Sequence, residues 1–178
     1  PLGKSLAVTW QSGFVVPTYM IEGDPTTGET LAPGLTTVHD LRNYAGIFAL
    51  PDSGGKAVMW NCPPIWGCAN INEGQVSAYG LNDVIELRNP GSEEELFNKV
   101  LLATEEKLAW LGYIWSPTKA ASTLDLTRLV EPNCGVGQNP EDGCGYDDSQ
   151  VRIAVHPSLV AEATDLVKLF RKWDFKES

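Results

Sequence analysis

Short apolar runs alternate with longer segments of helical periodicity from one end of the chain to the other. Strands are predicted for residues 5–10, 56–62, 83–87, 112–115, 124–131 and 151–155. Helices are predicted for residues 36–48 and 67–79, for a segment that opens after Ser92, and for a last segment that opens at Pro157. Strands that alternate with helices are typical of an α/β domain whose helices cover both faces of a sheet. We therefore expect a three-layer αβα fold with a mainly parallel sheet.

Capping residues support two of these helices. Thr37 is followed three residues later by Asp40, and Ser92 is followed by Glu95, as in the signals that open helices. The helix that Ser92 opens is expected to extend to Leu111, because apolar side chains recur at helical spacing up to that residue.

Two tryptophans lie at the ends of predicted strands. The stretch NCPPIWGC places Trp66 between the strand of residues 56–62 and a helix, and the stretch GYIWSPT places Trp115 at the end of another strand. Ligands of α/β sheets bind beyond the carboxyl ends of the strands. Proline and glycine flank both tryptophans, so a bulky side chain is difficult to bury there. We expect both indoles on the functional rim of the sheet.

The other four tryptophans give a weaker signal. Trp110 and Trp173 fall within predicted amphipathic helices, where packing is the expected role. Trp60 lies inside a predicted strand and is expected in the core, whereas Trp10 ends the first strand and can face either way.

Size and charge limit the classes of partner. The chain has 178 residues, of which 43% are hydrophobic, enough for one well-packed domain or one lobe of a larger protein. A formal net charge of −10 argues against nucleic acid or anionic lipid as a partner. The chain starts at Pro1 in a segment that already reads as structured, so we expect a processed or excised fragment. The lack of a signal peptide then says nothing about location.

Four cysteines fall into two close pairs, Cys62 with Cys68 and Cys134 with Cys144. The gaps do not match the usual spacing of zinc ligands, and the chain has only two histidines. Two local disulfides and an oxidising compartment are favoured, with free buried thiols as the alternative.

The two rim tryptophans point to a particular ligand chemistry. Indole faces attract cations, and recognition of quaternary ammonium groups is the best-attested use of such faces. Gly67 and Cys68 follow Trp66 at the start of a helix, where free backbone N–H groups and the helix dipole favour an anion. A cation cage beside a carboxylate cradle suits a small zwitterion such as a betaine, and simple packing is the alternative.

These residues resemble a known family. The segment CPPIWGCANINEGQVSAYGLNDVIEL and the strand end GYIWSPT resemble the glycine betaine/proline betaine substrate-binding proteins of ABC transporters. That family has a C-x-x-G-W-G-C turn before a helix and an aromatic-x-W-[ST]-P strand end. The segments GFVVPTYMIEGD, TTVHDLRNY and VRIAVHPSLVAEATDLVKLFRKW also look like family segments, so the resemblance covers nearly the whole chain.

The resemblance implies a fold and a function for the chain as a whole. Residues 1–178 would form a single α/β lobe of the type II periplasmic-binding-protein kind, the second lobe of a two-lobe protein, with hinge segments near both ends. The protein would be an extracytoplasmic solute-binding domain that delivers a betaine to ABC permease subunits, without a cofactor or metal. The other lobe would be missing from this chain, which would then bind ligand weakly or not at all.

The resemblance also assigns the site. Trp66 and Trp115 would be walls around the trimethylammonium group, and the amides of Gly67 and Cys68 would hold the carboxylate. A disulfide between Cys62 and Cys68 would shape this turn.

The sequence departs from the family pattern on both sides of the site. Ile65 replaces a frequent glycine, and Thr118 and Lys119 stand where members often carry an aromatic residue or histidine. A lysine beside a cationic ligand is unfavourable, so Lys119 is expected outside the cleft.

An enzyme is the main competing class, and the sequence argues against it. A cysteine nucleophile needs a nearby base, but His39 and His156 are both expected in surface or packing roles. No P-loop, HExxH or GxSxG motif occurs. The acidic loop NPEDGCGYDD lacks the spacing of an EF-hand and is expected to be a solvated surface loop.

Two questions stay open at this level. A ligand-sensing or interaction module that reuses the same lobe has the same sequence signals as a transport receptor. The ligand is also undecided among glycine betaine, proline betaine, carnitine and choline, of which choline lacks the carboxylate that the helix start would hold.

Overall fold

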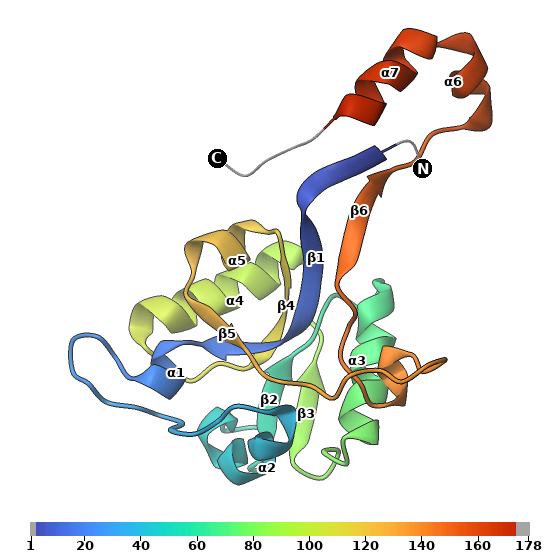
Figure 1. Ribbon diagram of the computed structural model, residues 1–178. Coiled ribbons are helices and arrows are strands. Elements are labelled where there is room, and N and C mark those ends of the chain that lie inside the picture. Colours follow the sequence, from blue (N-terminus) through green and yellow to red (C-terminus); the bar gives the residue numbers. More distant parts are fainter. Residues whose placement is uncertain (1–2, 174–178) are drawn as a thin grey trace. The chain divides into compact units, whose positions relative to one another are not determined.

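The computed structural model describes residues 3–173, and the side chain of Trp10 lies outside the described part (Figure 1). The chain divides into two compact units. The larger is Ser12–Asp147, and the smaller combines the two chain ends, up to Gln11 and from Asp148 onward.

A mixed sheet forms the centre of the larger unit. Its strands lie in the order β3 (Ile85–Arg88), β2 (Ala57–Trp60), β4 (Gly112–Ser116), β1 (Gly3–Pro17) and β5 (Leu126–Arg128). Strand β2 is parallel to both β3 and β4, whereas β5 is antiparallel to β1. The α/β fold is therefore as predicted, but the sheet is more mixed than the alternation of elements indicated.

Two long helices cover opposite faces of this sheet. Helix α3 (Gly67–Ala78) connects β2 to β3, and α4 (Glu93–Glu106) connects β3 back to β4 on the other side of β2. Right-handed connections that run in opposite directions along a sheet place their helices on opposite faces. Figure 1 shows this arrangement, with the short helix α5 (Lys119–Thr123) beside α4.

The ends of α4 follow from local chemistry. The Ser92 side chain accepts a hydrogen bond from the Glu95 N–H at 3.1 Å, as the capping signal predicts. The Glu95 carboxylate reaches Gly91 N–H at 2.7 Å, one residue earlier than a capping box requires. Lys107 has a positive φ of 55° and ends the helix. The predicted extension to Leu111 is therefore wrong.

Trp110 consequently lies in the connection between α4 and β4 rather than in a helix. Its side chain is buried, so the predicted packing role is confirmed in a different setting. Trp60 ends β2 and is half-buried beneath the ammonium group of Lys99, which lies 4.0 Å from the ring centroid.

The region before β2 is more broken than its periodicity predicts. Strand β1 runs to Pro17 and is followed by α1 (Tyr19–Glu22). The single helix expected for residues 36–48 consists of η1 (Val38–Asp40), α2 (Leu41–Tyr44) and η2 (Ala45–Phe48). The predicted start is confirmed, because Thr37 and Asp40 form a reciprocal capping box.

The larger unit has one continuous core between the sheet and its helices. Its most completely buried large side chains are Phe14, Val16, Met20, Leu35, Val38, Leu41, Met59, Gln75, Leu81, Leu96, Leu111 and Leu129.

The smaller unit pairs the two ends of the chain. The first half of β1 is antiparallel to β6 (Ser149–Ile153), with Gly3 opposite Ile153. The helix predicted from Pro157 onward is interrupted at Ala163 and forms α6 (Pro157–Glu162) and α7 (Thr164–Lys172). Trp173 was expected to pack within an amphipathic helix, but it follows the end of α7 and is 44% exposed.

Candidate functional site

Trp66 and Trp115 come together at one edge of the sheet. Strands β2 and β4 are parallel neighbours, so the turn after β2 and the end of β4 lie at the same edge. The ring centroids of Trp66 and Trp115 are 5.1 Å apart with planes at 73°, an edge-to-face contact. Sequence reasoning predicted that both tryptophans lie at this edge, and the structure brings them into contact.

Trp115 is more enclosed than its position at a strand end suggested. Its side chain is only 6% exposed, whereas Trp66 is half-buried. Besides Trp66, the rings of Phe97 and Tyr113 pack against it at centroid distances of 5.4 and 5.8 Å. The expectation that a bulky side chain is difficult to bury here is therefore wrong for Trp115, because neighbouring aromatic rings enclose it.

Three aromatic residues of this cluster were missed from the sequence. Phe97 falls within the helix predicted after Ser92 and Tyr113 within a predicted strand, and neither was given a role at the site. Tyr146 packs against Tyr113 with ring centroids 5.6 Å apart and planes at 56°, and it comes from the loop after Cys144, where no periodicity marks it. We name these three residues, with Trp66 and Trp115, the aromatic cluster.

The first turn of α3 lies immediately beside Trp66. Trp66 is the N-cap of the helix and has an extended backbone, with no side-chain cap. Within the described part of the chain, the amides of Gly67 and Cys68 donate no hydrogen bond, whereas Ala69 N–H donates to the Trp66 carbonyl at 3.1 Å. Gly67 is exposed, and a Cβ added there would meet no atom within 4 Å, so the surface of the first turn is open at this residue. The first turn has no acidic residue and suits an anion.

A disulfide and a buried asparagine hold the turn that precedes α3. Cys62 and Cys68 are bonded, with their Cα atoms 6.3 Å apart. Asn61 is completely buried and accepts the Cys62 N–H through Oδ1 at 2.8 Å. Its Nδ2 donates to the Ala69 carbonyl at 3.2 Å. The backbone is thus held at both ends of the turn.

Of the residues that depart from the family pattern, Ile65 and Lys119 lie at the surface, whereas Thr118 is half-buried and its hydroxyl donates to the Trp115 carbonyl at 2.7 Å. Ile65 is 92% exposed, and Lys119 is exposed at the start of α5. Lys119 lines a surface hollow of about 520 Å³ between α4 and α5, together with Phe97 and Leu101. The Ser116–Pro117 peptide before α5 is cis.

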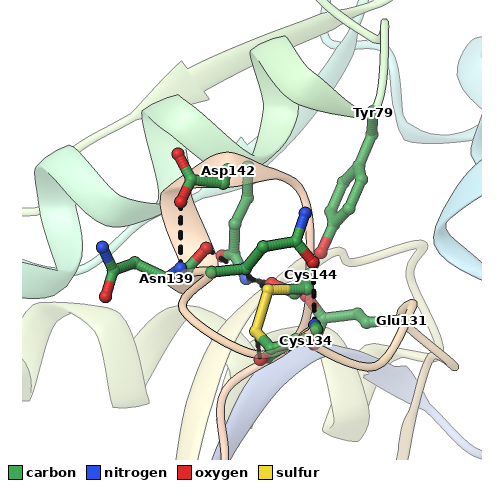
Figure 2. The surroundings of a disulfide bond; sticks show 10 residues. Tyr79, Glu131, Cys134, Asn139, Asp142 and Cys144 are labelled. Carbon is green, nitrogen blue, oxygen red and sulfur yellow. Dashed lines mark hydrogen bonds between the residues drawn. A yellow bond between two sulfur atoms is a disulfide. The ribbon is translucent and has the colours of Figure 1, made fainter.

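A buried carboxyl group lies beneath the second disulfide. The Glu131 side chain accepts hydrogen bonds at Oε1 from the Tyr79 hydroxyl at 3.0 Å and from Gln75 Nε2 at 3.1 Å. Burial raises the pKa of Glu131 to about 7, and the hydrogen bond from Tyr79 and the charge of Arg128 oppose this rise. Figure 2 shows Tyr79 and Glu131 directed toward the loop that carries the disulfide.

The Cys134–Cys144 disulfide closes that loop, as the spacing of the cysteines predicted (Figure 2). The loop contains a short turn, η3 (Pro140–Asp142), in which Asn139 and Asp142 form a reciprocal capping box. Its η3 turn packs against α3, and Gln75 of that helix donates to the Cys144 carbonyl at 2.7 Å. The loop is therefore anchored to the helix that begins at the site.

The remaining candidates for chemistry have local roles. His39 is exposed and lies edge-on to Tyr79 at 5.6 Å, and His156 caps α6 through a bond from the Ser158 N–H. Among residues 3–173, no three His, Cys, Asp or Glu side chains are grouped as metal ligands. No helix in the same range is long and apolar enough to cross a membrane.

Comparison with known sequences links the chain to solute-binding proteins. Residues 2–178 match the family model described as the substrate-binding domain of ABC-type glycine betaine transport systems. The trimethylamine N-oxide-binding protein of Pelagibacter ubique is 30% identical over 154 residues, which cover 83% of this chain and 48% of that protein. The glycine betaine-binding periplasmic protein OusX of Dickeya dadantii is 30% identical over 63 residues, 35% of this chain and 19% of that protein.

Solved structures show a similar fold. The ProX glycine betaine/L-proline-binding protein of Borrelia burgdorferi has a TM-score of 0.62 at 20% identity, over 98% of this chain and 54% of that one. Lactococcal OpuAC, closed on glycine betaine, has the same score and identity over 98% of this chain and 56% of that one. These likenesses confirm the predicted α/β fold, of the type II periplasmic-binding-protein kind. The trimethylamine N-oxide-binding protein and the two solved structures match most of this chain, but the chain spans only about half of the length of each of them.

Proposed function

Because the chain belongs to the family of substrate-binding domains of ABC-type glycine betaine transport systems, a family of solute-binding proteins rather than enzymes, we propose that it binds a small zwitterion with a quaternary nitrogen at the edge formed by Trp66 and the start of α3. The bound solute would be delivered unchanged to the permease subunits of an importer.

One observation carries this proposal: two indoles in edge-to-face contact lie beside the first turn of a helix. The exposed part of Trp66 would contact the ammonium group, and Trp115 would form the wall behind it. Each cation–π contact is worth about 0.5–2 kcal/mol, whereas micromolar affinity requires about 8 kcal/mol. The tryptophan pair therefore supplies only part of the binding free energy.

The ligand carboxylate would lie over the amides of Gly67 and Cys68. Both amides lack an acceptor in the described part of the chain, and the absence of a side chain on Gly67 lets an oxygen approach them. A charge-assisted hydrogen bond is worth about 1.5–3 kcal/mol, so two of them make up much of the remaining binding free energy.

The rest of the site would come from a second lobe outside this chain. The chain spans about half of its relatives, and Trp115 and Trp66 enclose a cation from one side only. We propose that the unit Ser12–Asp147 is the ligand-binding lobe, and that β1 and β6, which lie where the two units divide, are the hinge segments.

An extracytoplasmic location fits the family and the two disulfides. Neither disulfide would persist in a reducing cytosol, and the described residues contain no free cysteine. The protein would therefore act outside the cytoplasmic membrane, next to the permease.

Calorimetric titration tests the ligand class. The 178-residue chain, and the longer parent protein if these residues form one lobe of it, are titrated with glycine betaine, proline betaine, carnitine, choline and trimethylamine N-oxide. We expect glycine betaine to bind more tightly than choline, which leaves the helix amides unused. Trp66→Ala should lower the affinity for every ligand that binds. Trp173→Ala, at an exposed tryptophan of the smaller unit, should leave these affinities unchanged. Absence of binding by the parent protein to all five compounds contradicts the proposal.

A further inference from the structure

We propose that Tyr146 is a positioning residue for the zwitterion site, which it supports twice: through its hydroxyl at the carboxylate cradle and through its ring at the tryptophan wall. This inference rests on the proposed function. It concerns a residue that touches neither Trp66 nor the amides of α3 directly, but reaches both through short chains of contacts.

The hydroxyl of the half-buried Tyr146 begins a chain of hydrogen bonds that runs through two buried asparagines. It donates to Asn72 Oδ1 at 2.7 Å, and Asn72 Nδ2 donates to Asn61 Oδ1 at 2.6 Å. Both asparagines are completely buried, so neither side chain can exchange these bonds for water. The direction of each amide is therefore set by its neighbour in the chain.

Asn61 connects this chain of hydrogen bonds to the turn before α3. Its Oδ1 accepts the Cys62 N–H at 2.8 Å, and its Nδ2 donates to the Ala69 carbonyl at 3.2 Å. These two contacts enclose the segment that contains Gly67 and Cys68. The orientation of those two amides thus depends on Asn61, and that of Asn61 on Tyr146 through Asn72.

The ring of Tyr146 supports the other half of the site. It packs on Tyr113 with centroids 5.6 Å apart, and Tyr113 packs on Trp115 at 5.8 Å with planes at 31°. Trp115 in turn meets Trp66 edge to face. Loss of this ring would leave space behind Tyr113, and an aromatic neighbour would shift into it.

The second disulfide fixes the start of this support. Tyr146 follows Cys144 by two residues, and Cys144 is bonded to Cys134. Gln75 donates to the Cys144 carbonyl at 2.7 Å, and Gly145 N–H donates to the Pro132 carbonyl at 2.8 Å. The backbone is therefore held immediately before the tyrosine, which is what a positioning residue requires.

Two substitutions separate the two supports. Tyr146→Phe removes only the hydroxyl, so glycine betaine should bind about fivefold more weakly, while choline, which has no carboxylate, should change by less than about twofold. Tyr146→Leu also removes the ring and should lower the affinity for both glycine betaine and choline. The matched control is Tyr44→Phe, which removes the hydrogen bond from the Tyr44 hydroxyl to the Pro33 carbonyl, away from the site.

The ratio of the two affinities distinguishes positioning from general stability. A purely structural role would lower the melting temperature in Tyr146→Phe and leave the ratio of glycine betaine to choline affinity unchanged, which would overturn the proposal. An amide spectrum of the free protein gives a second readout. The signals of Cys62, Gly67 and Cys68 should shift in Tyr146→Phe and not in Tyr44→Phe. Unshifted signals overturn the hydrogen-bond support.

The proposed function can fail separately. If the unaltered parent protein binds none of the quaternary ammonium compounds, the zwitterion site itself is contradicted. The amide spectrum then decides the structural link alone, since it requires no ligand. A shift confined to Tyr146→Phe upholds that link, and no shift overturns it.

Discussion

The Tyr79 hydroxyl donates a hydrogen bond of 3.0 Å to Glu131, a carboxyl group that is 8% exposed and lies between α3 and the disulfide loop. Glu131 Oε2 is buried without a hydrogen-bond partner in the described structure. An ionised carboxylate with one unsatisfied oxygen is costly in such a place, and burial raises the pKa of Glu131 to about 7.

This relationship predicts that stability falls as the pH rises. The pKa of Glu131 is about 7 in the folded protein and near its ordinary value of 4.5 in the unfolded chain. The folded state therefore holds this proton more tightly. Its contribution is fully present below pH 4.5 and is lost as the pH rises through 7. The loss is about 3 kcal/mol in all, and chemical denaturation between pH 4.5 and 8 measures it.

Neighbouring groups do not reverse this trend. Burial raises the pKa values of Tyr79, Tyr113 and Tyr146, so these three side chains stay neutral in this range. Glu131→Gln should flatten the pH dependence. The control Glu106→Gln, at the exposed end of α4, should keep it. Equal slopes in the two variants would contradict the assignment to Glu131.

Gly112 predicts a steric limit at the start of β4. A Cβ at this position would lie 2.4 Å from the Trp110 ring and 2.9 Å from the Trp60 carbonyl oxygen. Gly112→Ala should therefore lower the free energy of unfolding by about 1–3 kcal/mol, because a buried ring and a strand backbone must both move.

Gly46 provides the comparison for that substitution. It lies in η2 without a positive φ, and an added Cβ would meet no atom within 4 Å. Gly46→Ala should leave the urea concentration at the unfolding midpoint unchanged or raise it slightly. If the two alanine variants unfold at the same denaturant concentration, the close packing of Trp110 on Gly112 is contradicted.

The sequence predicted the parts of the fold whose cause is local. Thr37 with Asp40 sets a helix start, and both ends of α3 were nearly correct, because capping and turn chemistry act within a few residues. The helix expected for residues 36–48 is broken into short pieces, since periodicity alone does not separate α-helix from 3₁₀ turns.

Of the candidate site, the sequence predicted the two tryptophans but not the aromatic residues that support them. Trp66 and Trp115 could be found because each lies near the end of a strand, with proline and glycine close by in the sequence. The burial of Trp115 depends on Phe97 from α4 and on Tyr113, which Tyr146 supports from a loop after the sheet. Tyr113 lies two residues before Trp115 on the same strand, but Phe97 and Tyr146 come from other elements. Contacts of these two residues leave no periodic signal, so their support could not be derived from the pattern.

Loss of either disulfide should weaken the fold. The bonds Cys62–Cys68 and Cys134–Cys144 close short loops with sequence separations of 6 and 10. Double serine variants should lose about 2 and about 3 kcal/mol of unfolding free energy, respectively, because the unfolded chain regains freedom.

Reduction provides the control for those variants. Dithiothreitol breaks both disulfides, so it should lower the unfolding free energy of the unaltered protein by more than either double serine substitution does. In each variant, dithiothreitol should lower the unfolding free energy only by the contribution of the remaining disulfide. A thiol titration that finds four free cysteines in the untreated protein would contradict both disulfides and the extracytoplasmic location.

The two tryptophans should respond differently to truncation. Trp115 is 6% exposed and packs on Trp66, Phe97 and Tyr113, so Trp115→Ala should cost about 3–5 kcal/mol of unfolding free energy. Trp66 is half-buried at the end of the cluster, so Trp66→Ala should cost less than half as much while weakening glycine betaine binding at least as strongly. Thermal unfolding and calorimetric titration measure the two effects, and Trp115→Phe keeps a ring in place should the alanine variant not fold. Equal losses of stability in the two alanine variants would mean that Trp66 is a packing residue, and the cation site would then have no accessible indole.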